Sequence, residues 1–185
     1  MSINSTILDV LLSHGAPRLR GLSSNFKTAR PFPHIVVDGL LPAWLLNEID
    51  HEFPDESASA CPSMGHRRGW HCTMHAPTVG GWKKLGTGDE MRMGSASRGV
   101  MQALKSAAFR QHIENLTGVG PLEPDPMNSG AGLHQIFPNG SLQLHADNNH
   151  MHNRDPASLD PNGPGCTKHY CAERRVNAFL YLNRE

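Results

Sequence analysis

One stretch in the second half of the chain constrains the fold more than any other. Residues 141–147, SLQLHAD, alternate strictly between polar and apolar side chains. Such alternation is typical of a β-strand with one face toward a core and the other toward water or a polar cavity. The preceding residues 133–137, LHQIF, also resemble a strand, and the turn PNG joins the two segments. The sequence therefore predicts two consecutive strands joined by a turn.

The polar face of the second predicted strand carries a possible pair of metal ligands. His145 and Asp147 are two positions apart, so both side chains leave the strand on the same side. An imidazole and a carboxylate presented together are two of the three ligands of the facial triad that binds Fe(II) and leaves positions open for other molecules. By itself, however, a His-x-Asp tripeptide is more typical of an ordinary half-exposed strand.

The rest of the chain gives shorter patterns. Residues 1–30 are expected to be a flexible leader with a short helix, and residues 54–95 and 148–173 are expected to be irregular. Two stretches have apolar residues at helical spacing, and two further apolar runs are typical of strands. The predicted elements are helices over residues 42–53 and 97–118, the latter capped by Gly118, and strands over residues 35–37 and 174–183.

The composition argues against several classes of function. The chain has 185 residues, which predicts one domain, and 17 basic residues balance 17 acidic ones. This balance argues against nucleic acid or an anionic membrane as the main partner. No apolar stretch is long enough to cross a bilayer, and the N-terminus lacks the features of a secretory signal. A cytoplasmic protein with reduced cysteines is therefore expected.

The surroundings of the His-x-Asp pair resemble a known family. Residues 130–153, GAGLHQIFPNGSLQLHADNNHMHN, and residues 174–183, RRVNAFLYLN, are similar to iron(II)- and 2-oxoglutarate-dependent oxygenases of the prolyl 4-hydroxylase type. The resemblance extends more loosely over residues 31–185. It implies a mainly β fold, with a double-stranded β-helix (jelly-roll) core over residues 126–185 that is incomplete in this sequence. Helical support over residues 31–125 would pack outside this core.

The resemblance also implies roles for individual residues. His145 and Asp147 match the first two iron ligands, and Gln135 matches a position near 2-oxoglutarate. Tyr181 matches a tyrosine whose phenol could hydrogen-bond the distal carboxylate of that cosubstrate, although a buried strand aromatic is an equal alternative. The family also needs a distal histidine and a basic carboxylate clamp. Both are expected beyond Glu185, in which case the chain is a fragment.

Other residues that could take part in chemistry have simpler interpretations. Two basic residues open the last predicted strand and could pair with acidic groups or line an entrance, while two asparagines there are expected to be structural. The loop histidines and cysteines could bind zinc, but their spacing in sequence is poor. The basic residues are Arg174 and Arg175, and the asparagines are Asn177 and Asn183. The possible zinc ligands are His150, His152, His169, Cys166 and Cys171. Cys61 and Cys72 are expected to be core residues or free thiols, and Trp70 and Trp82 to pack in their loop.

The resemblance implies a dioxygenase that hydroxylates an unactivated carbon. Fe(II) would be the metal, 2-oxoglutarate the cosubstrate and ascorbate the reductant. A prolyl residue is the first candidate substrate, with a peptide, a free amino acid or a small metabolite as alternatives. Two other classes stay open: a non-catalytic jelly-roll binding domain, including an inactive fragment, and a small zinc-binding interaction module. The sequence does not indicate an oligomeric state.

Overall fold

The computed structural model describes residues 3–53, 71–73, 84–125, 128, 131–136, 150–152 and 171–182. The chain divides into two compact units, residues 1–141 and residues 142–185. Among the described residues, no helix has both the length and the apolar character that are needed to cross a bilayer.

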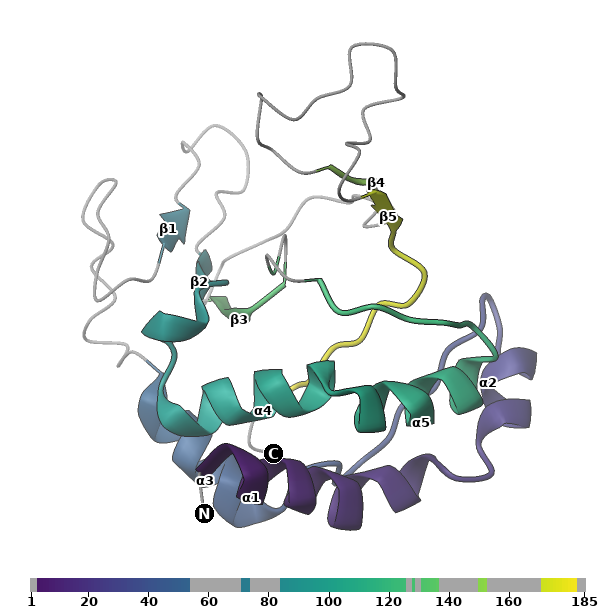
Figure 1. Ribbon diagram of the computed structural model, residues 1–185, viewed down its shortest axis with the longest axis horizontal. Helices are drawn as coiled ribbons and strands as arrows, with labels where there is room; N and C mark the ends of the chain where they lie inside the picture. Colours follow the sequence, from purple (N-terminus) through teal and green to yellow (C-terminus); the bar gives the residue numbers. More distant parts are fainter. Residues whose placement is uncertain are drawn as a thin grey trace. The chain divides into compact units, whose positions relative to one another are not determined.

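Helices form most of the described part of the first unit. They begin with α1 (Ile3–Val10), which continues through a π-helical turn, η1 (Leu11–Gly15), into a 3-10 turn, η2 (Ala16–Leu19). The later helices are α2 (Ser23–Thr28), α3 (Ala43–Glu52), α4 (Ser95–Lys105) and α5 (Ala107–Thr117). Both α1 and α3 pack against α4, and α2 packs against α5 (Figure 1).

The core of the first unit lies between these helices. Leu45 and Ile49 of α3 are 0% and 1% exposed, which confirms the helix predicted over residues 42–53. The segment expected to be a flexible leader instead supplies core side chains, including Ile7 and Leu11. Its apolar residues recur at helical spacing, and α4 provides the face on which they are buried.

The long helix predicted over residues 97–118 is divided into α4 and α5 at Ser106. The backbone of Ser106 is extended, and its Oγ accepts a hydrogen bond from the backbone N–H of Phe109 at 3.2 Å. Serine is a strong N-cap residue because its hydroxyl satisfies a free N–H in the first turn. Gly118, with φ 74°, ends α5 as the sequence predicted.

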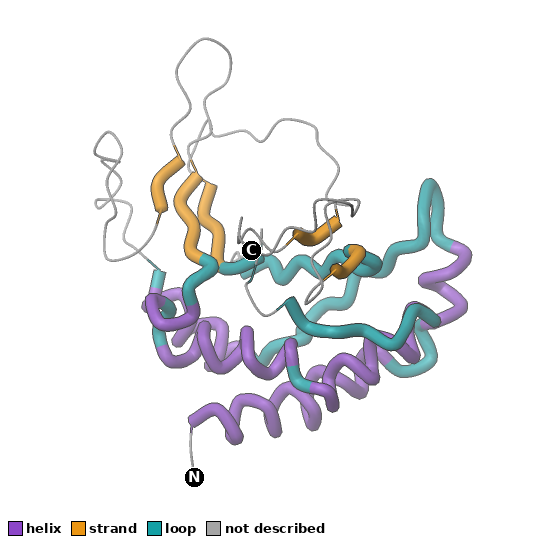
Figure 2. The backbone as a smooth tube through the Cα atoms, turned by 45° about the horizontal axis from the view of Figure 1, so that its top comes forward, coloured by secondary structure: helices purple, strands orange, loops and turns teal. Residues whose placement is uncertain are grey.

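Strands are few and short in the described residues. In the first unit, β1 (His71–Thr73), β2 (Lys84–Thr87) and β3 (Leu133–Ile136) form an antiparallel sheet in that order (Figure 2). A 3-10 turn, η4 (Glu90–Arg92), follows β2. In the second unit, β4 (His150–His152) and β5 (Cys171–Glu173) form an antiparallel pair.

The prediction of a mainly β, jelly-roll fold is wrong for the part of the chain that the structure describes. Helices predominate there, and no strand exceeds four residues. Residues 35–37, predicted as a strand, lie outside any helix or strand. Residues 174–182 also lie outside any strand. Alternation predicts an extended backbone, whereas a sheet also needs a neighbouring strand.

Candidate functional site

Gln135 is the predicted cosubstrate residue that the structure describes in most detail. It lies on β3, directly opposite Leu85 of β2. Along β3, Leu133 and Gln135 are half-buried, whereas His134 and Ile136 are exposed. The alternation therefore turns Gln135 toward the covered face of the sheet and His134 toward the opposite face.

The side-chain amide of Gln135 has a buried end without a partner. Its Oε1 atom is inaccessible to solvent and has no hydrogen bond. Buried polar atoms in folded proteins are nearly always hydrogen-bonded, so an exception needs an explanation. A 180° rotation of the amide exchanges Oε1 and Nε2, so this end can accept a hydrogen bond or donate one to a carboxylate.

Asn128 fixes the point at which the chain enters β3. Its Nδ2 donates to the carbonyl oxygen of Gly88 at 2.8 Å and to Oε1 of Glu90 at 3.2 Å. The backbone N–H of Ala131 donates to the carbonyl oxygen of Asn128 at 3.0 Å. Because both partners of Nδ2 are acceptors, the orientation of this amide is determined. Its Oδ1 is buried and lacks a partner, like Oε1 of Gln135.

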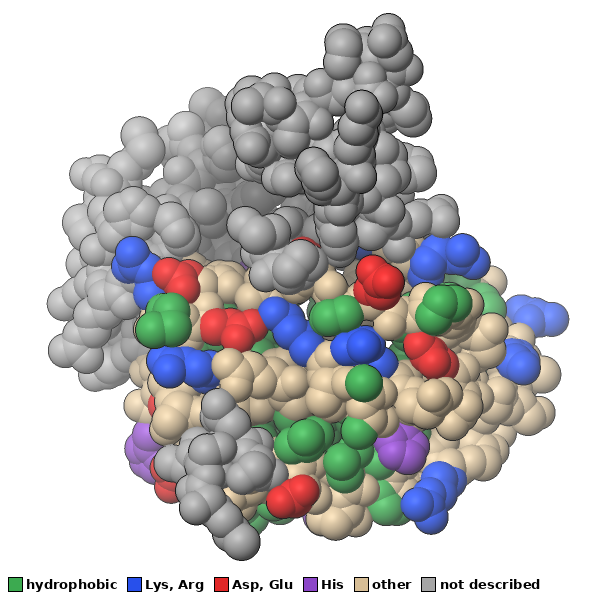
Figure 3. All heavy atoms as spheres, viewed as in Figure 1, with side chains coloured by type: hydrophobic (Ala, Val, Ile, Leu, Met, Phe, Trp, Pro, Cys, Tyr) green, Lys and Arg blue, Asp and Glu red, His purple; other side chains and the backbone are tan. Residues whose placement is uncertain are grey.

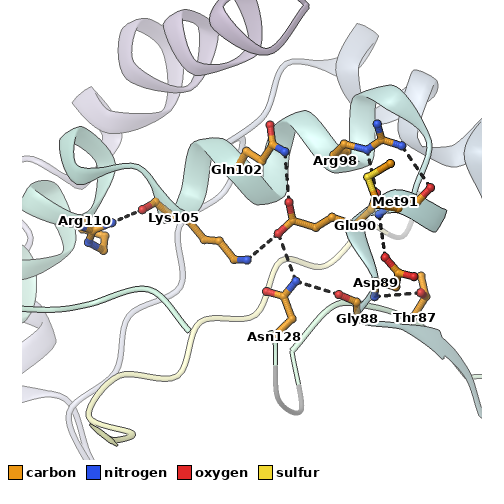
Figure 4. A network of polar contacts seen from close by, with 10 residues as sticks. All are labelled: Thr87, Gly88, Asp89, Glu90, Met91, Arg98, Gln102, Lys105, Arg110 and Asn128. Carbon is orange, nitrogen blue, oxygen red and sulfur yellow. Dashed lines mark hydrogen bonds and ion pairs between the residues drawn. The ribbon is translucent and has the colours of Figure 1, made fainter. Parts of the chain in front are cut away.

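Glu90 is the centre of the polar network that holds Asn128 (Figure 4). Nζ of Lys105 contacts its Oε1 at 2.6 Å, and Nε2 of Gln102 donates to its Oε2 at 3.2 Å. The side chains of Lys105 and Glu90 are 24% and 22% exposed. This pair is therefore better shielded from water than a surface ion pair, which contributes little to stability.

Arg98 holds the turn that carries Glu90. Its Nε donates to the carbonyl oxygen of Glu90 at 2.8 Å, and a terminal nitrogen donates to that of Met93 at 2.9 Å. Together with Lys105, it ties η4 to α4 (Figure 4).

Basic and acidic side chains are interspersed on the described part of the face in Figure 3, so this face carries a mixed charge pattern.

The pKa of the Glu90 carboxyl lies below its ordinary value. Burial by itself raises this pKa. Hydrogen bonds from Lys105, Asn128 and Gln102, together with the charge of Lys105, lower the pKa by more than burial raises it. The charged carboxylate is thus the form that the folded protein favours. This carboxylate serves as an acceptor for the network rather than as a proton donor near neutral pH.

A pH-dependent contribution of Glu90 to stability follows. Folding lowers the pKa of Glu90 from its value of about 4.5 in the unfolded chain. The charged carboxylate therefore stabilises the protein fully above about pH 4.5, and this stabilisation is lost as the pH falls through the lower pKa of the folded state. We expect Glu90→Gln to lower the free energy of unfolding at neutral pH, and the difference from wild type to shrink in acid. Urea unfolding over a pH series measures this, with exposed Glu123→Gln as the control. A difference independent of pH would contradict the prediction.

Tyr181 lies in the second unit and is not a buried aromatic. Its side chain is 79% exposed, and that of Phe179 is 69% exposed. Their rings stack with centroids 6.4 Å apart. Arg174 is half-buried and Arg175 is exposed. The phenol of Tyr181 is thus accessible to a ligand, and the alternative that it packs in a core is wrong.

Both predicted iron ligands, His145 and Asp147, lie outside the described residues. Among the side chains that the structure describes, no three His, Cys, Asp or Glu residues form a group that could hold a metal ion. His150 and His152 form the ends of β4, Cys171 begins β5, and Cys72 lies in β1. The other singled-out residues outside the description are Cys61, Trp70, Trp82, Cys166, His169 and Asn183.

The sequence placed Gln135 on a strand, as the structure does, but it gave no indication of the network around Glu90. Glu90, Lys105 and Asn128 come from a turn, a helix and a loop, and no spacing in the sequence connects them. The one indication in the local sequence was Asn128, a residue type that suits a turn with positive φ. Asparagine tolerates positive φ, and Asn128 adopts φ 50°.

Comparisons of the chain with protein-family models, curated proteins and solved structures found no match.

Proposed function

We propose that this protein is an Fe(II)- and 2-oxoglutarate-dependent dioxygenase that hydroxylates an unactivated carbon. The observation that carries the proposal is the His145-x-Asp147 pair at the end of an alternating segment, within a sequence similar to the prolyl 4-hydroxylase type. His145 and Asp147 lie outside the described residues, so the proposal rests on the sequence around them.

The proposed ligands suit the proposed metal and cosubstrate. An imidazole and a carboxylate are the donors that non-haem Fe(II) uses in oxygenases. The buried and unpartnered amide end of Gln135 supports a role in binding, because a bound carboxylate would satisfy it. The phenol of Tyr181 is exposed, so it is available to donate a hydrogen bond to a ligand.

Each residue would then have a limited task. His145 and Asp147 would bind the iron, while Gln135 and Tyr181 would orient the cosubstrate. When bound, iron and 2-oxoglutarate supply an oxidation by O2 that releases succinate and CO2 and adds a hydroxyl group to the substrate. Ascorbate would keep the iron reduced. A prolyl residue is the first candidate substrate, and peptides, free amino acids and small metabolites are alternatives.

Substitution of the two iron ligands tests the proposal. In the complete protein, succinate formation from 2-oxoglutarate with Fe(II), O2 and ascorbate is expected to fall to background in His145→Ala and in Asp147→Ala. In Gln135→Ala, the KM for 2-oxoglutarate is expected to rise about tenfold or more, as for the loss of a hydrogen bond to a charged group.

His134→Ala is the matched control for Gln135→Ala. His134 is the neighbouring residue on β3 and is exposed on the other face of the sheet. We expect its substitution to leave the KM for 2-oxoglutarate unchanged. Succinate formation that persists in His145→Ala or Asp147→Ala would disprove the proposed function.

A further inference from the structure

The segment between α1 and α3 carries a local excess of basic residues. Residues 10–37 hold four of the 17 basic residues of the chain and none of its 17 acidic residues. The four basic residues, all of them exposed, are Arg18, Arg20, Lys27 and Arg30. Although the whole chain is balanced in charge, η2, α2 and the residues that follow them therefore present a locally positive surface to solvent.

The surroundings of α2 do not neutralise this positive charge. No carboxylate of the described residues forms an ion pair with any of the four cations. The helix α5, which packs on α2, has Glu114 as its one acidic residue and also carries Arg110. The Glu114 carboxylate accepts a hydrogen bond from the backbone N–H of Leu122 at 2.6 Å. In Figure 3 the charges are mixed over most of the face, but at the end that α2 forms they are basic.

An exposed apolar tip follows these basic residues directly. Residues 31–33, Pro-Phe-Pro, come immediately after Arg30 and are all exposed, and the side chain of Phe32 is 63% exposed. The ring of His34 lies against that of Phe32, with centroids 5.3 Å apart, and its Nδ1 lies 2.9 Å from the carbonyl oxygen of Phe32. These contacts hold Phe32 in place while most of its apolar surface faces solvent, which is typical of a side chain that contacts a partner.

We propose that these four cations and Phe32 form a docking surface for a membrane that contains anionic lipids. Cations attract anionic headgroups, and an apolar side chain beside them inserts among the lipids. Single-stranded nucleic acid is a weaker match, because its bases stack on aromatic rings and the prolines on both sides of Phe32 offer none. The protein would lie on the membrane surface rather than cross it. The docking surface uses none of the residues assigned to iron or to 2-oxoglutarate, so it does not depend on the proposed function.

Co-sedimentation of the protein with lipid vesicles tests the proposal. Wild type is expected to bind vesicles of phosphatidylcholine with about 30% phosphatidylserine, and not vesicles of phosphatidylcholine alone. The binding should weaken at about 0.5 M salt, because salt screens the attraction. Lys27→Gln and Arg30→Gln are each expected to lower the partition coefficient about fivefold, the effect of one cation near an anionic surface. Phe32→Ser is expected to lower it about tenfold or more, because an inserted apolar side chain is lost.

The controls are exposed residues of the same kinds elsewhere in the first unit. Arg92 is exposed on η4, and Trp44 is 51% exposed on α3, which lies away from α2 in Figures 1 and 2. Arg92→Gln and Trp44→Ser are expected to keep wild-type binding. Equal losses in Lys27→Gln and Arg92→Gln would mean that binding follows the net charge of the chain, and would overturn the proposal. So would binding to a single-stranded oligonucleotide but not to the anionic vesicles, or equal binding to anionic and neutral vesicles.

Discussion

Replacing Glu52 with alanine is expected to lower the free energy of unfolding of the first unit by about 2–4 kcal/mol, the range for losing a helix cap with charge-assisted hydrogen bonds. The Glu52 carboxylate, at the end of α3, accepts hydrogen bonds from the backbone N–H groups of Ala96 and Ser97 at 2.7 and 2.8 Å. It also accepts one from the hydroxyl of Ser97 at 2.6 Å. These N–H groups belong to the first turn of α4, where a helix has no internal partners for them.

The position of Glu52 makes this contribution larger than that of an ordinary cap. Gly94, the residue that precedes α4, has no side chain to cap the helix. The carboxylate therefore performs the capping from another helix and joins α3 to α4. Its negative charge also lies at the positive end of the α4 dipole, which stabilises it further. Loss of the side chain removes a cap and a contact between helices at once.

Urea unfolding followed by circular dichroism measures the effect of Glu52→Ala. Glu48→Ala is the matched control, because Glu48 lies one turn earlier on α3 and is exposed. Glu52→Gln should recover part of the loss, since an amide keeps one acceptor oxygen but loses the charge. Equal stabilities of Glu52→Ala and Glu48→Ala would show that the capping contacts are energetically unimportant.

The capping of α4 illustrates why the sequence predicted only part of this fold. Elements with a complete local signal were predicted well: the helix after Pro42, the end of α5 at Gly118 and strand β3. Contacts between distant residues were not, and Glu52 and Ser97 are 45 positions apart. The burial of the first helix on α4 has the same character, because its apolar stripe does not identify the face that covers it.

The candidate site shows the same division between local and distant information. Gln135 was singled out because it lies in a recognisable strand next to the motif, and the structure places it on β3. The residues that hold its strand in place, Glu90, Lys105 and Asn128, were missed because they meet only in the folded chain. The fold class was wrong because short alternating segments were taken as parts of a larger sheet.

Replacing Gly132 with alanine is the second substitution expected to have a large effect, of about 3 kcal/mol or more from backbone strain and overpacking together. Gly132 has φ 132°, a conformation that L-residues rarely adopt. A Cβ atom there would lie 2.1 Å from the carbonyl oxygen of Thr87 and 2.9 Å from Cα of Gly88. Both contacts are with backbone, so a side-chain movement cannot relieve them.

The damage from Gly132→Ala should reach the candidate site as well as the stability of the sheet. Gly132 directly precedes β3, and Leu133 is paired with Thr87 of β2. Separating the two strands at this end would displace Gln135, two residues further along β3. We therefore expect the KM for 2-oxoglutarate to rise in Gly132→Ala, in the direction of Gln135→Ala, if Gln135 binds this cosubstrate.

Gly21→Ala separates the two causes of the expected destabilisation. Gly21 also has positive φ, 75°, but nothing lies within 4 Å of a Cβ atom built there. Gly21→Ala should therefore lower the free energy of unfolding only through backbone strain, by about 1–2 kcal/mol, and leave the KM for 2-oxoglutarate unchanged. Urea unfolding of both variants measures the comparison. If Gly132→Ala destabilised the protein no more than Gly21→Ala does, the close packing of β3 on β2 at Thr87 would be incorrect. A larger loss together with a raised KM would connect that packing to the proposed binding of the cosubstrate by Gln135.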